Sequence, residues 1–131
     1  MVTKINNKDL TGHKSHEKMI PKDRIKDLKQ LEVSIEKAKK AAVLALFVPK
    51  KNIPHLVLIK RNSYHGVHSA QIAFPGGKPE VEDKDLQATA LREAWEEIGV
   101  NIQEVKIVTH LSKVYIQPSN FLVTPFLGYC E

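Results

Sequence analysis

The feature that most constrains the fold is an unbroken apolar run at residues 41–48, AAVLALFV. A run of this length, rich in branched side chains, predicts a buried β-strand. The segment PKKNIP follows it and predicts a turn. A second strand is therefore expected at residues 55–61, HLVLIKR, antiparallel to the first through that short connection.

The rest of the chain predicts further elements on both sides of this pair. Residues 21–40 show the apolar spacing of a helix, whereas residues 1–20 are polar and predict a loop or loosely held arm. A short strand is expected in QIAF (71–74), and an extended segment with a bend near Ser112 at residues 105–117. Another strand is expected at residues 121–130, interrupted at Pro125 or placed at a sheet edge by it.

The segment at residues 86–98 predicts an amphipathic helix. Its apolar stripe recurs every four residues, at Leu86, Ala90, Ala94 and Ile98. Asp85 or Asp83 is placed to cap the start of the helix, and Gly99 to end it in the left-handed conformation. Trp95 is expected to pack beside this helix, with base stacking as the alternative.

Three glutamates, Glu93, Glu96 and Glu97, lie close together on that helix, and their mutual repulsion has to be offset. Glu93 and Glu97 are four residues apart, so their carboxylates point to one patch. Like charges at this spacing cost an isolated helix roughly 0.2–0.5 kcal/mol. A divalent cation with oxygen ligands would remove the cost, whereas a solvated acidic face is the simpler alternative. The nearby FPGGK, whose two glycines let a ligand or a neighbouring element approach the backbone, favours the cation.

Length and composition limit the classes of protein that remain. A chain of 131 residues suits one domain, and it has neither an apolar run of about 18 residues nor an apolar signal sequence, so no membrane partner is expected. The net charge of +5 lies in residues 1–40, because residues 41–131 carry equal numbers of acidic and basic side chains. That distribution argues against a nucleic-acid partner. The single cysteine, Cys130, fits a reducing cytoplasm.

Residues 77–100, GKPEVEDKDLQATALREAWEEIGV, resemble the Nudix box. That signature is Gly, five residues, Glu, seven residues, then Arg-Glu-apolar-x-Glu-Glu-x-Gly-apolar. The second half matches from Arg92 to Val100. In the first half, Asp83 replaces the glutamate, and eight residues separate it from Arg92. This expansion, together with LIKRNSYHGVHSAQIAFPGGK upstream, is similar to the coenzyme A pyrophosphatase branch of the family.

The resemblance implies an α/β protein with the Nudix α/β/α sandwich and a mixed sheet. It divides the chain into a basic arm and helix at residues 1–40 and a Nudix domain at residues 41–131. Nudix domains usually continue into a further strand and a C-terminal helix, so those two elements are expected to be missing here. A sheet edge would then be left uncovered.

Site residues carry over from the family by position. Glu93 and Glu97 are implied as the main metal ligands, with Glu96 and the Gly77 carbonyl as further ligands. The implied cofactor is Mg²⁺, for which Mn²⁺ can substitute. Arg92 is implied to orient the glutamates. The general base stays open between Glu96, Glu93 and a residue beyond the motif.

Substrate contacts are expected around the loop before the box. Lys60 and Arg61 end a strand near it and are candidates for phosphate contact, with solvated side chains as the alternative. His68 in the loop, and Gly76 and Lys78 beside it, are further candidate substrate-binding residues; for His68 an exposed loop histidine is the alternative.

The resulting functional hypothesis is Mg²⁺-dependent hydrolysis of a pyrophosphate bond in a small-molecule nucleotide. The favoured substrate is coenzyme A or a derivative, giving 3′,5′-ADP and 4′-phosphopantetheine. Other nucleotides, namely nucleoside triphosphates, NADH, ADP-ribose and nucleotide sugars, are the alternatives within the class. A nucleotide-binding Nudix module without turnover is the alternative outside it. Many Nudix proteins dimerise, so a homodimer is compatible with this reading.

Overall fold

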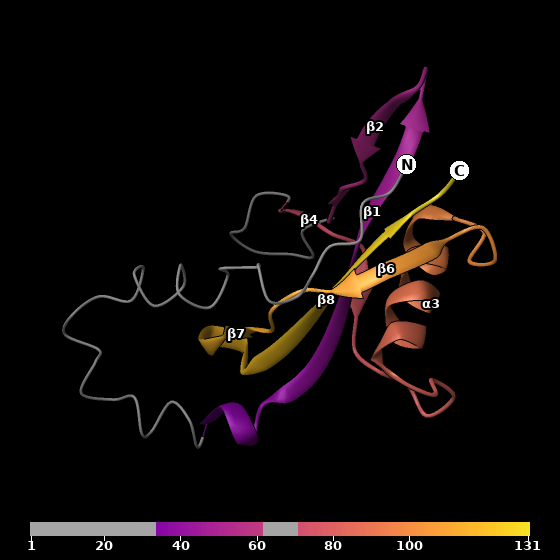
Figure 1. The fold of residues 1–131 in the computed structure, drawn as a ribbon. Helices are drawn as coiled ribbons and strands as arrows, with labels where there is room; N and C mark the ends of the chain where they lie inside the picture. The colour runs from indigo at the N-terminus through magenta and orange to yellow at the C-terminus, as the bar shows by residue number, and fades with distance from the viewer. Residues whose placement is uncertain (1–33, 62–70) are drawn as a thin grey trace.

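A computed structural model describes residues 34–61 and 71–131 of the chain, and Figure 1 shows a mixed sheet with one long helix against it. The central strands β1 (Lys39–Lys50) and β8 (Phe121–Tyr129) run parallel, whereas every other pair in the sheet is antiparallel. The sheet order is β2–β1–β8–β6, with β5 also on β1 and β7 also on β8. The bounds of these strands are β2 Ile53–Leu56, β5 Gly76–Gly77, β6 Lys106–His110 and β7 Val114–Ile116. A short 3₁₀ helix, η3 (Gln117–Ser119), joins β7 to β8.

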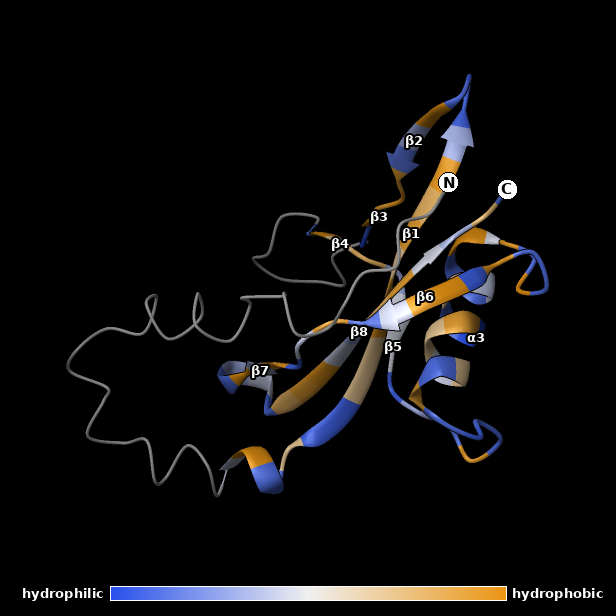
Figure 2. Ribbon diagram, viewed as in Figure 1, coloured by the Kyte–Doolittle hydropathy of each residue, from blue (hydrophilic) through white to orange (hydrophobic). Residues whose placement is uncertain are grey.

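The apolar run predicted as a strand forms the middle of β1. Alternate residues of β1 face the helix α3 (Leu86–Ile98), and Figure 2 shows the hydrophobic middle of the strand between hydrophilic ends. Burial of Leu44 and Leu46 contributes roughly 1.5–3 kcal/mol for each side chain. The core consists of Ala42, Leu44, Leu46, Ala90, Ala94 and Phe126. The small side chains of α3 in this set let the helix lie close to the sheet.

The helix α3 has the bounds that its stripe predicts, and both of its ends are capped. Asp85 Oδ1 accepts a hydrogen bond of 2.8 Å from the Ala88 N–H. Gly99 adopts a left-handed conformation with φ of 67°, and its N–H donates to the Trp95 carbonyl over 2.9 Å. The cap prediction is confirmed for Asp85, and the helix end at Gly99 is confirmed too.

The single strand predicted at residues 55–61 is wrong, because the chain divides it between two sheets. The first part pairs with β1 and ends at Leu56, whereas β3 (Ile59–Lys60) pairs with β4 (Ile72–Ala73) in a separate sheet. The reason lies at the edge of β1 that β8 does not occupy. Farther along that edge, β5 pairs with β1, and Leu44 N–H donates to the Pro75 carbonyl over 2.8 Å. Because β5 occupies this edge of β1, the residues after Leu58 pair with β4 instead.

Pro125 lies inside β8 between β1 and β6, so the prediction of an interrupted or edge strand is wrong. Its carbonyl accepts a hydrogen bond of 2.8 Å from the Leu111 N–H. In a strand the N–H and C=O of one residue point to the same side, so the missing donor of Pro125 also faces that side. There β6 has ended at His110 and β7 begins only at Val114, so the side of Pro125 that lacks a donor faces the gap between these two strands. The same gap interrupts the extended segment expected at residues 105–117 near Ser112, where the sequence predicts a bend.

The helix predicted at residues 21–40 lies mostly outside the described residues. Its described part is helical at residues 34–36 and gives way to β1 at Lys39, so the predicted end at Lys40 is wrong. Within the described ranges, no helix has the length and apolarity that a membrane span requires.

Candidate functional site

The two glycines of FPGGK form β5 and lie against the middle of β1. Gly76 is opposite Val43, and Gly77 is opposite Ala42. A Cβ atom on Gly76 would overlap the Ala42 carbonyl oxygen and lie 2.6 Å from Val43 Cα. The backbone therefore approaches β1 at a distance that only glycine permits. We call residues 76 and 77 the diglycine.

Two glutamates of α3 meet the diglycine from successive turns of the helix. The Gly76 N–H donates to Glu97 Oε2 over 2.9 Å. A Cβ atom on Gly77 would overlap Glu93 Oε1, so this carboxylate fills the space that a side chain at position 77 would need. The i, i+4 pair identified from the sequence thus points to the same backbone segment.

The environment of Glu93 is unfavourable for a bare carboxylate. Burial is the main cause that raises the pKa of Glu93, and the charges of Glu96 and Glu97 raise it further, against an opposing effect of Arg92. An arrangement that withdraws like charges from water is stabilised by a cation. Two carboxylates beside a backbone carbonyl supply the hard oxygen donors that Mg²⁺ and Mn²⁺ prefer, so the residues present fit such an ion.

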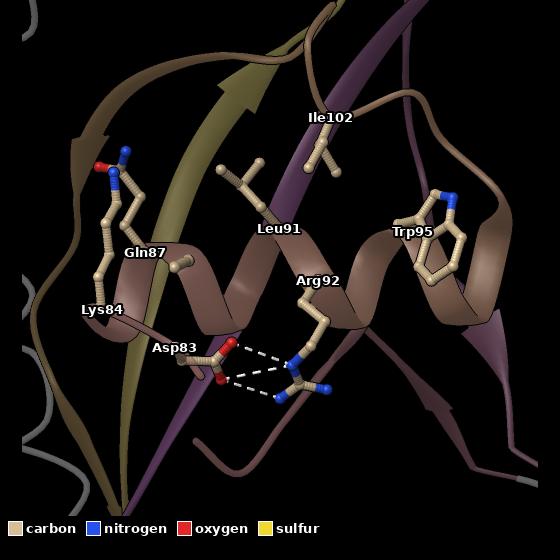
Figure 3. A pocket seen from close by; sticks show the side chains of 8 residues that line it. Asp83, Lys84, Gln87, Leu91, Arg92, Trp95 and Ile102 are labelled. Atoms are coloured by element: carbon tan, nitrogen blue, oxygen red, sulfur yellow. Dashed lines mark hydrogen bonds and ion pairs between the residues drawn. The ribbon is translucent and has the colours of Figure 1, made fainter. Parts of the chain in front are cut away.

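Arg92 joins the helix to the acidic turn before it. Its Nε donates to Asp83 Oδ1 over 3.1 Å, and its Nη2 donates to Asp83 Oδ2 over 3.0 Å (Figure 3). The same Nη2 donates to the Lys78 carbonyl over 2.9 Å. The guanidinium lowers the pKa of Asp83 to about 2, and Asp83 in turn raises the pKa of Arg92. The turn and the helix are therefore held as one unit.

The remaining nitrogen of Arg92 lies between two box glutamates. Nη1 is 3.2 Å from Glu96 Oε1 and 3.3 Å from Glu93 Oε1. Glu96 therefore turns toward Arg92, and its side chain is 43% exposed. In the part of the chain that the structure describes, no three His, Cys, Asp or Glu side chains converge as a metal site. The structure brings Glu93 and Glu97 to the diglycine and Glu96 to the guanidinium.

The predicted substrate-binding residues have different surroundings. Arg61 Nη2 donates to the Gly76 carbonyl over 3.1 Å, so this guanidinium already has a backbone acceptor. Lys60 is exposed at the end of β3. Lys78 Nζ lies 5.4 Å from the centre of the Phe121 ring, where cation and ring attract each other. His68 lies outside the described residues.

Two contacts of the site are not predicted from the sequence. Asp83 is the main partner of Arg92, although the sequence treats it only as a substituted box position and a candidate cap. Its place in the first half of the box is the signal that could have identified it. Phe121, which lies under Lys78, comes from a distant strand and gives no such signal.

Trp95 is 58% exposed, so the prediction that it packs beside the helix is wrong. It lines a shallow hollow of about 350 Å³ on the outer side of α3, together with Leu91 and Ile102 (Figure 3). The inner side of the helix is already filled by Ala90 and Ala94, which leaves no room for an indole ring there.

Comparison with known proteins assigns this arrangement to a family. The family model described as the NUDIX domain matches residues 37–129. The chain belongs to the Nudix family. Nudix hydrolases generally use divalent metal cations, which agrees with the donor set at the diglycine.

Curated relatives named as Nudix proteins match about two thirds of this chain. The chain is 40% identical over 88 residues to the Nudix hydrolase NudL of Photorhabdus laumondii, covering 67% of this chain and 46% of that protein. It is 35% identical over 92 residues to the peroxisomal coenzyme A diphosphatase NUDT7 of Mus musculus, covering 70% of this chain and 39% of that protein. The chain therefore spans less than half the length of these relatives.

Solved structures of Nudix proteins share the fold. A C. elegans Ap4A hydrolase superposes with a TM-score of 0.56 at 18% identity, covering 71% of this chain and 68% of that one. The NUDIX domain of Shewanella oneidensis NrtR, complexed with ADP ribose, gives a TM-score of 0.56 at 14% identity, covering 72% and 61%. The predicted α/β fold with a mixed sheet is confirmed.

Proposed function

We propose that this Nudix domain hydrolyses a pyrophosphate bond in a nucleotide derivative, with Mg²⁺ as its cofactor. The observation that carries the proposal is the meeting of Glu93 and Glu97 at the diglycine, where one carboxylate accepts the Gly76 N–H and the other packs on Gly77. Mn²⁺ can replace Mg²⁺ because both ions accept carboxylate and carbonyl oxygens.

The side chains divide the work of holding the cation and handling the proton. Glu93 and Glu97, with the Gly77 carbonyl, would hold the ion, and Glu96 would contribute a further oxygen. When bound, the ion cancels charge on the phosphate oxygens, which is the main need of phosphoanhydride cleavage. Glu93 or Glu96 accepts the proton of the attacking water. Arg92 orients both carboxylates through Nη1.

The favoured substrate is coenzyme A or a derivative, cleaved to 3′,5′-ADP and 4′-phosphopantetheine. The support is the 35% identity to a mouse protein named as a coenzyme A diphosphatase. Lys60 and Lys78 are proposed phosphate contacts, because both are cationic and lie on segments next to the diglycine. A cytoplasmic location and a homodimer stay predictions.

A hydrolysis assay across substrates tests the proposal. The purified chain is incubated with Mg²⁺ and coenzyme A, NADH, ADP-ribose or a nucleoside triphosphate, and the products are separated by chromatography. Release of 3′,5′-ADP from coenzyme A, faster than hydrolysis of the other three, is expected. Turnover of a different nucleotide would contradict the proposed substrate but support the proposed reaction. Binding without turnover on any of them would contradict the hydrolase and favour a nucleotide-binding module.

A further inference from the structure

Arg61 reaches the diglycine from the second sheet. It follows β3, and its own N–H donates to the Gln71 carbonyl over 3.0 Å, which anchors its backbone beside β4. Its guanidinium then spans the gap between the two sheets, and Nη2 donates to the Gly76 carbonyl over 3.1 Å. This contact links a side chain of the second sheet to the strand that meets Glu93 and Glu97.

Gly76 lies between two peptide groups that are held from opposite sides. The preceding peptide is held through the Pro75 carbonyl, which accepts from the Leu44 N–H over 2.8 Å. The following peptide is held through the Gly76 carbonyl by Arg61. A glycine without such restraints samples a wide range of φ and ψ. The Pro75 bond holds the peptide that carries the Gly76 N–H, and the Arg61 bond holds the next peptide. Gly76 is thereby restrained on both sides where its N–H donates to Glu97 over 2.9 Å.

We propose that Arg61 is a positioning residue, which acts through the Gly76 backbone to hold the Glu97 carboxylate in place for a divalent cation. This inference rests on the proposed function, because it takes Glu97 as a ligand of the cation. In this role Arg61 acts before any substrate binds. The alternative expected from the sequence, a contact with a substrate phosphate, operates only when the nucleotide is bound.

The sign of the effect on metal binding separates positioning from simple electrostatics. A guanidinium near a divalent cation repels it, so removal of the charge alone would strengthen binding of the ion. Loss of a residue that orients a ligand weakens metal binding, by about 10–100-fold in known metal sites. Weaker binding after removal of Arg61 therefore cannot come from its charge.

Binding of Mn²⁺ to the full chain without nucleotide provides the test, followed by the EPR signal of free Mn²⁺. Arg61→Ala is expected to raise the Kd for Mn²⁺ about tenfold. Arg61→Lys keeps one donor for the Gly76 carbonyl, so it should recover part of the affinity. Lys60→Ala removes a neighbouring positive charge and should leave the Kd unchanged or slightly lower. The unfolding temperature of each variant, measured alongside, identifies any loss that comes from unfolding.

A double variant tests whether Arg61 acts through Glu97. If it does, Arg61→Ala should add less than about twofold to the Kd of Glu97→Gln, because the ligand it positions is already lost. Full additivity would overturn the inference, as would a wild-type Kd in Arg61→Ala. In the latter case a raised KM for the nucleotide would identify a phosphate contact. If the unmodified chain bound no Mn²⁺, the proposed function itself would fail, and that result differs from both of the others.

Discussion

The backbone N–H of Gly76 donates to Glu97 Oε2 over 2.9 Å, although 21 positions separate the two residues in the chain. This bond joins the residue just before the Nudix box to the second half of the box. It is possible because β5 lies flat against β1 while α3 packs on the same part of β1, so the glycine and the helix face each other. The packing of the core thus sets the geometry of the candidate site.

Gly77→Ala should disturb the site more than the fold. The added Cβ would overlap Glu93 Oε1, which is the far end of a flexible side chain, so the carboxylate can rotate away at small cost. We expect a loss of stability below about 1 kcal/mol together with Mn²⁺ binding weakened about tenfold or more. Urea unfolding and Mn²⁺ titration measure the two effects.

Gly76→Ala is the matched comparison and should behave differently. Its Cβ would meet the backbone of Ala42 and Val43, which cannot rotate away, so a loss of stability of about 2 kcal/mol or more is expected. Equal stability losses in the two variants would show that this description of the diglycine is wrong.

Much of the helix that carries the candidate site could be predicted from the sequence, because several local sequence patterns predict the same helix. The helix α3 carries its apolar stripe, its Asp85 cap and its Gly99 end within fifteen residues, and all three appear in the structure. The i, i+4 spacing of Glu93 and Glu97 also survives, because helix geometry fixes it. None of these features depends on a distant partner.

Asp83→Asn should remove an acid-sensitive part of the stability. The Arg92 guanidinium lowers the pKa of Asp83 from its ordinary value of 3.8 to about 2, so this ion pair stabilises the fold fully above about pH 4. That contribution is lost as the pH falls toward 2. At pH 7 the variant should therefore unfold at a lower temperature than the wild type, and the difference should shrink between pH 4 and pH 2. A difference that stays constant over this range would contradict the assignment.

The cap of α3 gives a prediction about stability alone. Asp85→Ala removes the acceptor of the Ala88 N–H, which should cost about 1 kcal/mol in urea unfolding. Lys84→Ala, at the neighbouring exposed position, serves as the control and should change stability by less than about 0.5 kcal/mol. If both variants lost the same amount, the cap would contribute nothing specific.

The elements that sequence reasoning missed depend on partners far along the chain. The strand predicted at residues 55–61 divides because β5 occupies part of the edge of β1. No local sequence pattern predicts that β5 and this strand compete for the same edge. Pro125 is tolerated in a central strand because the side that lacks its donor faces the gap between β6 and β7. Trp95 is exposed because Ala90 and Ala94 already fill the space under α3. Each case is decided by tertiary packing.

Dependence of hydrolysis on free Mg²⁺, compared between the wild type and Glu97→Gln, tests the central claim most directly. The glutamine keeps an oxygen for the Gly76 N–H but loses the charge that a cation needs. The rate should vanish with a chelator, return with Mg²⁺, and require about tenfold or more Mg²⁺ for half-saturation in Glu97→Gln. Glu82→Gln, which changes the same charge at an exposed position in the acidic turn, should follow the wild type. Hydrolysis that persists in the chelator, or the same Mg²⁺ dependence in Glu97→Gln and the wild type, would contradict the account.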